Sequence, residues 1–419
     1  METKKHGKTT YTAITAFLSV FVMYITFFFV QEELKNVTGD YAGHLYEYLP
    51  LLSGESFLKG WMAVPYCMWH LLVKLVYATP AIPLEAAAGY VSAAFAGFSF
   101  YVTYYFLSRI AKSENLEANA VKISLLTFAL SIVEPVCVYW FSAQNQYLGQ
   151  FSINPMHNPT HMCVKPFCIL AMMLVYDLWE KIDDDEYKGV FFDVSEGTKK
   201  AFIGLSVVLL LSTFAKPTFA EMFIPTVAFM MLFLWIKKLV SKDGSAKEYF
   251  GNCLYMLYAA LPALLFILIQ ALAYFAWGGS YGVESTKVEI TSFLEVWKMF
   301  SDNIIASVFM GIGFPLIMLL VDGYFFKTNR LGQMSVWGYV IGFIEAALLG
   351  EATKLGHGDF LWPLMSGMTL IWYVCVARLM VVDEREAAAK WINVLRQVAW
   401  CVFSLFVLFG ALYIYRQIF

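Results

Sequence analysis

Long apolar runs recur along the whole of this 419-residue chain, and they constrain its fold more than any other feature. A run of roughly 18 or more apolar residues is long enough to cross the hydrocarbon core of a bilayer as a helix. Hydrophobic residues make up 60% of the chain and charged residues only 15%, against about 25% charge in a soluble protein. The sequence therefore predicts an all-α, polytopic transmembrane helix bundle that forms one integral membrane domain over residues 1–419, in contact with the lipid bilayer.

We expect eleven spanning helices, at 11–31, 84–108, 122–141, 161–180, 200–215, 218–236, 253–277, 303–326, 334–350, 361–380 and 397–415. Residues 61–79 are apolar but short, and they contain Pro65, His70 and Lys74. We interpret this segment as a re-entrant or juxtamembrane element within a first extracytoplasmic loop at about 32–83. If it spanned the membrane instead, every later helix would be inverted.

The distribution of Lys and Arg predicts the orientation in the membrane. With the N-terminus inside, the inner segments hold 20 of the 29 Lys and Arg residues. Because cytoplasmic loops are enriched in these residues, we expect a cytoplasmic N-terminus and an extracytoplasmic C-terminus in the cell's cytoplasmic membrane. The net charge of −3 gives no reason to expect a nucleic acid partner. The sequence has no clear metal or nucleotide motif, so no cofactor is expected.

The first outer loop carries the most reactive set of side chains. On a helix, Asp40, His44 and Glu47 occupy positions i, i+4 and i+7 and share one face. Each has a plain structural alternative: Asp40 could be a helix N-cap after Gly39, and His44 a packed interfacial histidine. Their shared position just outside the first span favours a functional interpretation.

Other ionisable side chains at the membrane boundary fall on the same predicted side, where such residues are costly and usually functional. Lys216 is the strongest case, because a lysine between two apolar spans needs an anionic partner or a wet cavity. That partner could be Glu221 or a ligand phosphate. The prolines around His157 could equally form only a stiff turn. The candidate substrate- or phosphate-binding residues are His157, Lys165, Lys216, Glu221, Glu351, Lys354 and His357.

This pattern resembles the C-type (GT-C) superfamily of membrane glycosyltransferases. The resemblance rests on many spans, a cytoplasmic N-terminus and an acidic residue in the first outer loop, here Asp40 in Gly39-Asp40-Tyr41. It implies juxtamembrane helices after that residue, a sugar donor on a polyprenyl phosphate or diphosphate, and Asp40 as the catalytic base. The loop lacks the paired acidic dyad of the metal-dependent, oligosaccharyltransferase-like members.

The resemblance implies transfer of the sugar to a glycan, lipid or protein acceptor in cell-envelope assembly. Asp40 would take the acceptor's proton, with His44 orienting Asp40 or sharing the proton, and the anomeric carbon would be inverted. The main alternative is a multipass transporter or flippase for a lipid-linked or anionic substrate, which predicts repeats and charges reachable from both sides. A surface polysaccharide polymerase or ligase and a purely structural membrane subunit are further alternatives.

Overall fold

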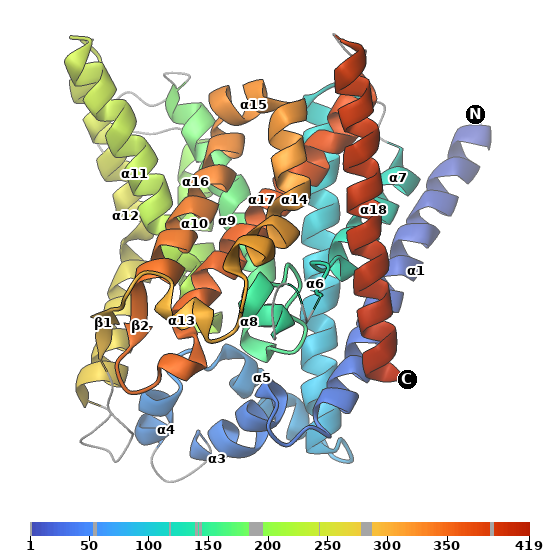
Figure 1. Cartoon of the computed structure of the whole chain (residues 1–419), viewed down its shortest axis with the longest axis vertical. Coiled ribbons are helices and arrows are strands. Elements are labelled where there is room, and N and C mark those ends of the chain that lie inside the picture. The colour runs from blue at the N-terminus through green and yellow to red at the C-terminus, as the bar shows by residue number, and fades with distance from the viewer. Residues whose placement is uncertain are drawn as a thin grey trace.

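The computed structural model describes residues 2–52, 57–116, 119–138, 141, 145–183, 196–242, 244–277, 287–385 and 389–419. Within these residues, ten helices are long and apolar enough to cross a membrane (Figure 1). They belong to α1 (Glu2–Glu33), α6 (Leu84–Ser113), α9 (Pro159–Asp183), α10 (Glu196–Ala215), α11 (Thr218–Val240), α12 (Ala246–Ala271), α14 (Ile304–Val321), α16 (Arg330–Leu348), α17 (Trp362–Asp383) and α18 (Lys390–Ile418). The chain is thus a multi-pass membrane protein built as an all-α bundle.

The helix α17 forms the centre of the bundle. Every residue from Trp362 to Val382 is buried, as expected for a helix that is hydrophobic on all sides. Its closest neighbour is α16, and a Cβ added at Gly367 would lie 2.9 Å from the carbonyl oxygen of Gly338. A small residue at this position therefore lets the two backbones approach, as is common between membrane helices. Outer helices such as α12 and α18 leave large apolar side chains exposed, which suits contact with lipid.

Short helices cover one end of the bundle, at the bottom of Figure 1. They are α2 (Asp40–Ala42), the π-helical turn η1 (Gly43–Tyr48), α3 (Leu49–Leu51), α4 (Phe57–Ala63) and α5 (Met68–Tyr77). The side chain of Gln31, near the end of α1, donates to the carbonyl oxygen of Glu85 at the start of α6, at 2.9 Å. The segment between them therefore starts and finishes at this end, and residues 61–79 do not cross the bundle.

The predicted span at 122–141 is not a continuous helix. α7 (Ala120–Ile132) has 13 residues and ends before Glu134-Pro135, because proline lacks an N–H and disfavours helix in the residue before it. At about 1.5 Å per residue, such a helix is shorter than the ~30 Å hydrocarbon core. The chain continues without helix through residues 133–138 to α8 (Gln146–Gln150).

The segment after α7 still carries the chain to the other end of the bundle. Lys122 pairs with Asp383 and Glu384 at one end, whereas Asn158 contacts Asp40 at the other. Non-helical backbone at this depth is stable only when protein groups satisfy it. The amide of Asn154 does so by donating to the carbonyl oxygens of Leu130 and Val133, at 3.0 and 2.7 Å.

The remaining short elements lie between the later helices. They are η2 (Leu272–Trp277), β1 (Val288–Ile290), α13 (Glu295–Lys298), α15 (Gly323–Thr328), β2 (Leu349–Glu351), η4 (Leu355–His357) and η5 (Asp359–Leu361). The two strands pair antiparallel, with Val288 opposite Glu351. Together with η4 and η5 they bring the 349–361 segment towards the end that carries α2 to α5 (Figure 1).

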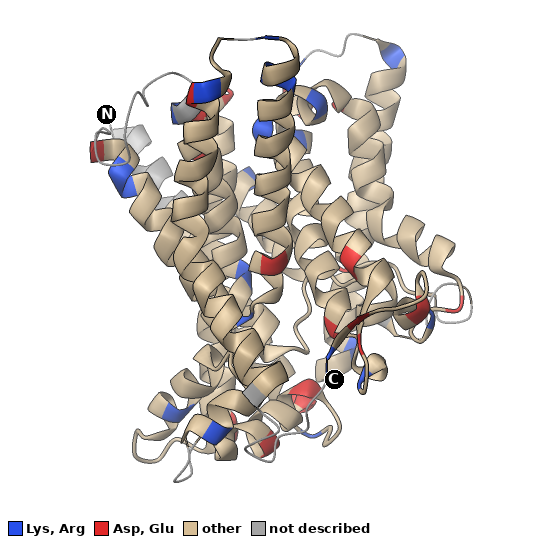
Figure 2. Cartoon of the chain, turned by 90° about the vertical axis from the view of Figure 1, so that its left-hand side faces the viewer, with Lys and Arg blue, Asp and Glu red and all other residues tan. Residues whose placement is uncertain are grey.

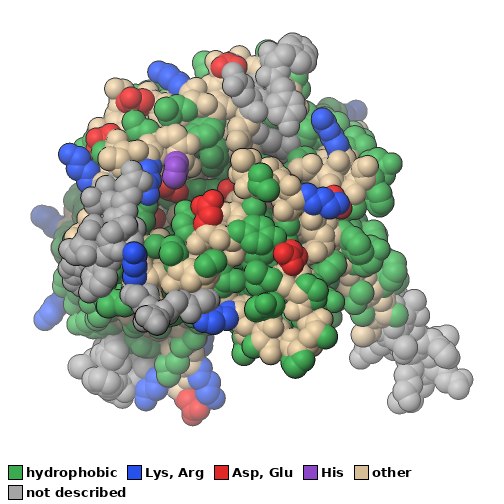
Figure 3. All heavy atoms as spheres, turned by 90° about the horizontal axis from the view of Figure 1, so that it is seen from below, with side chains coloured by type: hydrophobic (Ala, Val, Ile, Leu, Met, Phe, Trp, Pro, Cys, Tyr) green, Lys and Arg blue, Asp and Glu red, His purple; other side chains and the backbone are tan. Residues whose placement is uncertain are grey.

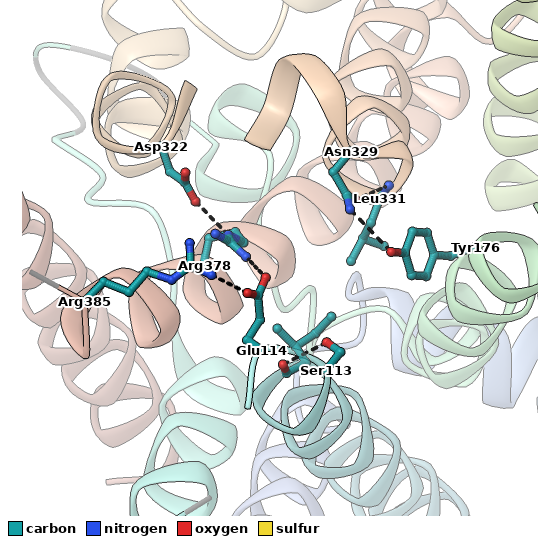
Figure 4. Close-up of polar contacts among 9 residues, drawn as sticks. Ser113, Glu114, Tyr176, Asp322, Asn329, Leu331, Arg378 and Arg385 are labelled. Carbon is teal, nitrogen blue, oxygen red and sulfur yellow. Dashed lines mark hydrogen bonds and ion pairs between the residues drawn. The ribbon is translucent and has the colours of Figure 1, made fainter. Parts of the chain in front are cut away.

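A buried ion-pair network holds the opposite end of the bundle together (Figure 4). Arg378 on α17, only 3% exposed, pairs with Glu114 after α6 and with Asp322 between α14 and α15. Arg385 contacts the second oxygen of Glu114. The predicted span at 303–326 is therefore interrupted at Asp322, because that residue turns its carboxylate to Arg378 (Nε–Oδ2 2.7 Å).

The two chain termini lie at opposite ends of the bundle (Figure 1). The side chain of Gln417 donates to a carboxylate oxygen of Glu33 at 2.9 Å, which places the C-terminus beside the end of α1. Charged residues concentrate towards the two ends, and few lie midway (Figure 2).

Candidate functional site

A polar cavity of about 500 Å³ lies at the end of the bundle that carries α2 to α5. Segments far apart in the sequence meet there: the first loop, the stretch before α9, the α10–α11 junction and the 356–362 stretch. Figure 3 views the molecule from this end and shows acidic and histidine side chains among apolar ones. The polar and aromatic lining consists of Thr38, Asp40, His44, Glu47, Tyr48, Tyr66, Asn145, Tyr147, His157, Asn158, Lys216, His357, Asp359 and Trp362.

Asp40 is the first residue of α2 and is held by two side chains from the stretch before α9. The amide nitrogen of Asn158 donates to Asp40 Oδ2 at 2.7 Å, and Nε2 of His157 lies 3.8 Å from the same oxygen. The Asp40 side chain is 40% exposed. One oxygen is therefore fixed by the protein, while the carboxylate stays open to a ligand in the cavity.

Asn158 occupies its position because it is the residue before the N-terminus of α9. Its Oδ1 accepts from the backbone N–H of His161 at 2.9 Å, which is N-cap geometry, and Pro159 stands at the first helical position. The backbone donor identifies Oδ1 as the oxygen, so the amide nitrogen must face Asp40. The same Oδ1 also accepts from Lys216 Nζ at 3.3 Å. One asparagine thus joins Asp40 to Lys216.

Lys216 lies at the junction between α10 and α11 and is only 6% exposed. Its Nζ lies 3.7 Å from the ring centroid of Trp362. Burial lowers the pKa of Lys216 to about 8. The negative charges of Asp40, Asp359 and Glu221 act in the opposite direction, because they favour the ammonium form. Its close contacts are thus Asn158 and Trp362, while Glu221 acts on it as one of three nearby acids.

His44 contacts a second histidine and not Asp40. Its Nδ1 lies 3.0 Å from Nε2 of His70 on α5. Burial lowers the pKa of His44 well below its usual value, and the neighbouring His70 and Lys216 act in the same direction. Among the described residues the Asp40 carboxylate is contacted by Asn158 and His157, and His44 makes no hydrogen bond to it.

His157 is sandwiched between aromatic rings. Its ring stacks on Tyr147, with centroids 3.3 Å apart, and lies 5.8 Å from Trp362. Burial lowers the pKa of His157 to about 4, although the Asp40 charge opposes this. The imidazole is therefore neutral at pH 7 and lies beside Asp40 as a polar ring and not as a cation.

A second cavity of about 300 Å³ adjoins the first and shares Lys216, Trp362, Tyr66 and Asp359 with it. Its other walls are largely apolar, formed by α12 and η2 residues such as Ile267 and Phe275.

Glu221 and Glu351 also line this second cavity. Burial raises the pKa of Glu351 to about 7, and the adjacent Asp359 adds to this effect. Lys354 lies nearby, with Nζ 3.4 Å from the hydroxyl of Tyr274.

Lys165 is not brought to either cavity lining. It is 4% exposed, donates to Oδ1 of Asn154 and lies 5.5 Å from the ring centroid of Tyr373. Near Asn154, the carboxylate of Glu134 accepts from the hydroxyl of Ser152 at 2.7 Å. Lys165 therefore stabilises the non-helical segment after α7.

Several lining residues were not among the candidates from sequence. Asn158 had a usable signal, since an asparagine before a proline at a helix start is a typical N-cap. Asp359 lies close in sequence to the candidates Glu351, Lys354 and His357, which pointed to the right region. Tyr66 and Tyr147 had no signal, because each depends on how the short helices pack.

No protein-family profile matches this chain, and a search of curated proteins finds no match either. In the part of the chain that the structure describes, no group of three or more His, Cys, Asp or Glu is placed to hold a metal ion. The fold and the site together define a polytopic membrane protein with a polar cavity at one end and an apolar cavity beside it.

Proposed function

We propose that this protein is a glycosyltransferase that moves a sugar from a polyprenyl phosphate or diphosphate to an acceptor hydroxyl. The observation that carries the proposal is the bridge through Asn158. It fixes a carboxylate, Asp40, and a buried ammonium group, Lys216, on the same cavity. Sugar transfer from a phosphate needs one group of each kind: a base for the acceptor and a cation for the leaving group.

The reaction is a single displacement. The acceptor oxygen forms a bond to the anomeric carbon while its proton passes to the Asp40 carboxylate. The bond from that carbon to the phosphate oxygen breaks, and the phosphate leaves with the electron pair beside Lys216. Because attack and departure occur on opposite faces of the sugar, the anomeric configuration inverts.

The second cavity supports a lipid-linked donor. A phosphate at Lys216 would lie at the boundary of both cavities, with the sugar in the polar one and the lipid chain along the apolar wall of α12. A further apolar cavity of about 300 Å³ lies between α10, α11 and α12, lined by residues such as Phe223 and Leu257. An isoprenoid chain that leaves Lys216 along α11 and α12 would meet this cavity next.

The opposite end of the bundle favours an enzyme over a transporter. A transporter must open its binding site to both sides in turn. Here Arg378 bridges Glu114 and Asp322 at the far end, so opening that end would require separating a buried ion-pair network. We place the cavity on the extracytoplasmic side, with the N-terminus cytoplasmic, because the inner segments predicted from the sequence hold 20 of the 29 Lys and Arg residues.

The proposal is tested on the purified full-length chain in liposomes. The donors are fluorescent polyprenyl phosphates and diphosphates that carry a radiolabelled sugar, offered with glycan, lipid-alcohol and peptide acceptors. We expect loss of the sugar–lipid bond and recovery of the label on an acceptor. Movement of intact donor between leaflets, with the bond preserved, would instead identify a flippase.

A further inference from the structure

Two buried histidines form a pair at the edge of the polar cavity. His44 in η1 lines the cavity, whereas His70 on α5 lies behind it and is 0% exposed. The only polar contact joining them runs between Nδ1 of His44 and Nε2 of His70, at 3.0 Å, among the residues that the structure describes. Since α5 and η1 both belong to the first loop, the pair also ties this loop together.

The surroundings of Nδ1 of His70 determine which nitrogen carries the proton in each of the two rings. In a neutral imidazole, one nitrogen carries the proton and donates, and the other accepts. Nδ1 of His70 is buried and has no hydrogen-bond partner among the described residues. An unsatisfied buried N–H is rarer than an unsatisfied acceptor, so the His70 proton belongs on Nε2. His70 then donates to Nδ1 of His44, which leaves the His44 proton on Nε2.

Charged forms of the pair are disfavoured by what surrounds it. The neighbouring rings are those of Tyr48 and Trp69, which carry no charge at neutral pH. The nearby ionic group that acts on His44 is Lys216, whose positive charge opposes a second cation. Burial lowers the pKa of His70 to about 3, so both rings are neutral at pH 7.

We propose that His70 is a positioning residue that fixes His44 with its proton on Nε2, so that His44 presents a hydrogen-bond donor to an anionic oxygen bound beside Lys216. His44 is then a binding group for phosphate and takes no proton from the acceptor. This inference rests on the proposed function only for the choice of phosphate as the ligand. The tautomer itself follows from the geometry of the pair.

The tautomer is measured by solid-state NMR on the full-length protein in lipid, with ¹⁵N-labelled histidine. The His44→Gln variant assigns the resonance of His44 by its loss. In the wild type we expect His44 to be neutral, with Nε2 protonated and Nδ1 accepting a hydrogen bond. A His44 that is protonated on Nδ1, or on both nitrogens, at pH 7 overturns the proposal.

Two substitutions at His70 separate positioning from packing. In His70→Gln the side-chain amide keeps an N–H near the position of Nε2, whereas His70→Met fills similar space without a donor. We expect the glutamine variant to keep the His44 tautomer and the methionine variant to show a mixture. An unchanged His44 spectrum in a folded His70→Met variant shows that His70 does not position it.

Binding of inorganic pyrophosphate, followed by calorimetry, tests the ligand. We expect the wild type and His70→Gln to bind similarly, and His70→Met to bind more weakly by the fraction of His44 that takes the other tautomer. His44→Met, which removes the donor itself, should bind about tenfold or more weakly, because a charge-assisted hydrogen bond is lost. Equal affinities in the wild type and His44→Met overturn the role of His44 as a phosphate donor. Pyrophosphate binding without any sugar transfer would contradict the proposed function and leave this inference standing.

Discussion

The side-chain amide of Asn158 donates to the carboxylate of Asp40 at 2.7 Å, across 118 positions of sequence. This one contact connects the first loop to the start of α9. Because Asn158 also caps α9 and accepts from Lys216, the geometry of the cavity depends on the position of one helix terminus.

Replacing Asn158 with aspartate should reduce kcat by at least about a hundredfold. An aspartate keeps the oxygen that accepts from His161 and Lys216, but it puts a second carboxylate against Asp40 in place of a donor. Two adjacent carboxylates share a proton, so the pH dependence of kcat should also move upward. The control is Asn119→Asp at the exposed N-cap of α7, where aspartate caps equally well and activity should be unchanged.

Replacing Lys216 with methionine should weaken transition-state binding by about 2–4 kcal/mol, measured as kcat/KM, because the leaving phosphate loses its cation. The methionine keeps the apolar contact with Trp362. In the wild type, kcat/KM should fall above about pH 8, where Lys216 loses its proton. Lys216→Arg should keep its activity to higher pH. The exposed Lys298→Met is the control, and an equal loss there would show that the effect is only one of net charge.

Glu351 should make stability depend on pH. Its folded pKa of about 7 lies above the ordinary value of 4.5, so the folded state retains a proton that the unfolded chain loses. Stability is therefore fully present below about pH 4.5 and declines as the pH rises to about 7. Compared with Glu351→Gln, the wild type should lose about 1–2 kcal/mol of unfolding free energy between pH 5 and 7. A wild type that gains stability relative to Glu351→Gln as the pH rises from 5 to 7 would contradict this assignment.

Replacing Arg378 with methionine should destabilise the fold by about 3–5 kcal/mol, because Glu114 and Asp322 would lose their buried partner. Chemical denaturation in detergent measures this loss. In the double variant Arg378→Met/Asp322→Asn, part of the lost stability should return. The half-exposed Arg385 pairs with the same Glu114, and Arg385→Gln should cost less than about 1 kcal/mol. Equal losses at the two arginines would show that burial of Arg378 is not what makes it important.

The sequence was sufficient to predict the helix bundle, because long apolar runs rarely form anything other than membrane helices. It also placed most of the site at one end: Asp40, His44, His157, Lys216 and His357 all line the first cavity. What failed at 122–141 was the assumption that an apolar run is one helix. Glu134-Pro135 breaks it, and the freed backbone carbonyl groups accept hydrogen bonds from Asn154. The sequence alone does not reveal this contact, because Asn154 follows in a later segment of the chain.

Partners within the site could not be read from the sequence, because they depend on tertiary packing. Nothing at His44 indicates that it contacts His70, and nothing at Lys165 indicates that Asn154 holds it away from the cavity. Polar groups at the membrane boundary thus identified a region, while the role of each group depended on its neighbours in space.

The central claim is that Asp40 is the base for sugar transfer, and the most direct test is the kcat of Asp40→Asn. The amide has the same size as the carboxylate and can still accept from Asn158, so the cavity should keep its shape. We predict that kcat falls by about a hundredfold or more while KM for the donor changes little, because a base contributes about 10²–10⁴ to the rate. Asp302→Asn, at an exposed aspartate outside the cavity lining, should keep the wild-type rate. An Asp40→Asn variant that transfers sugar as fast as Asp302→Asn would contradict the account.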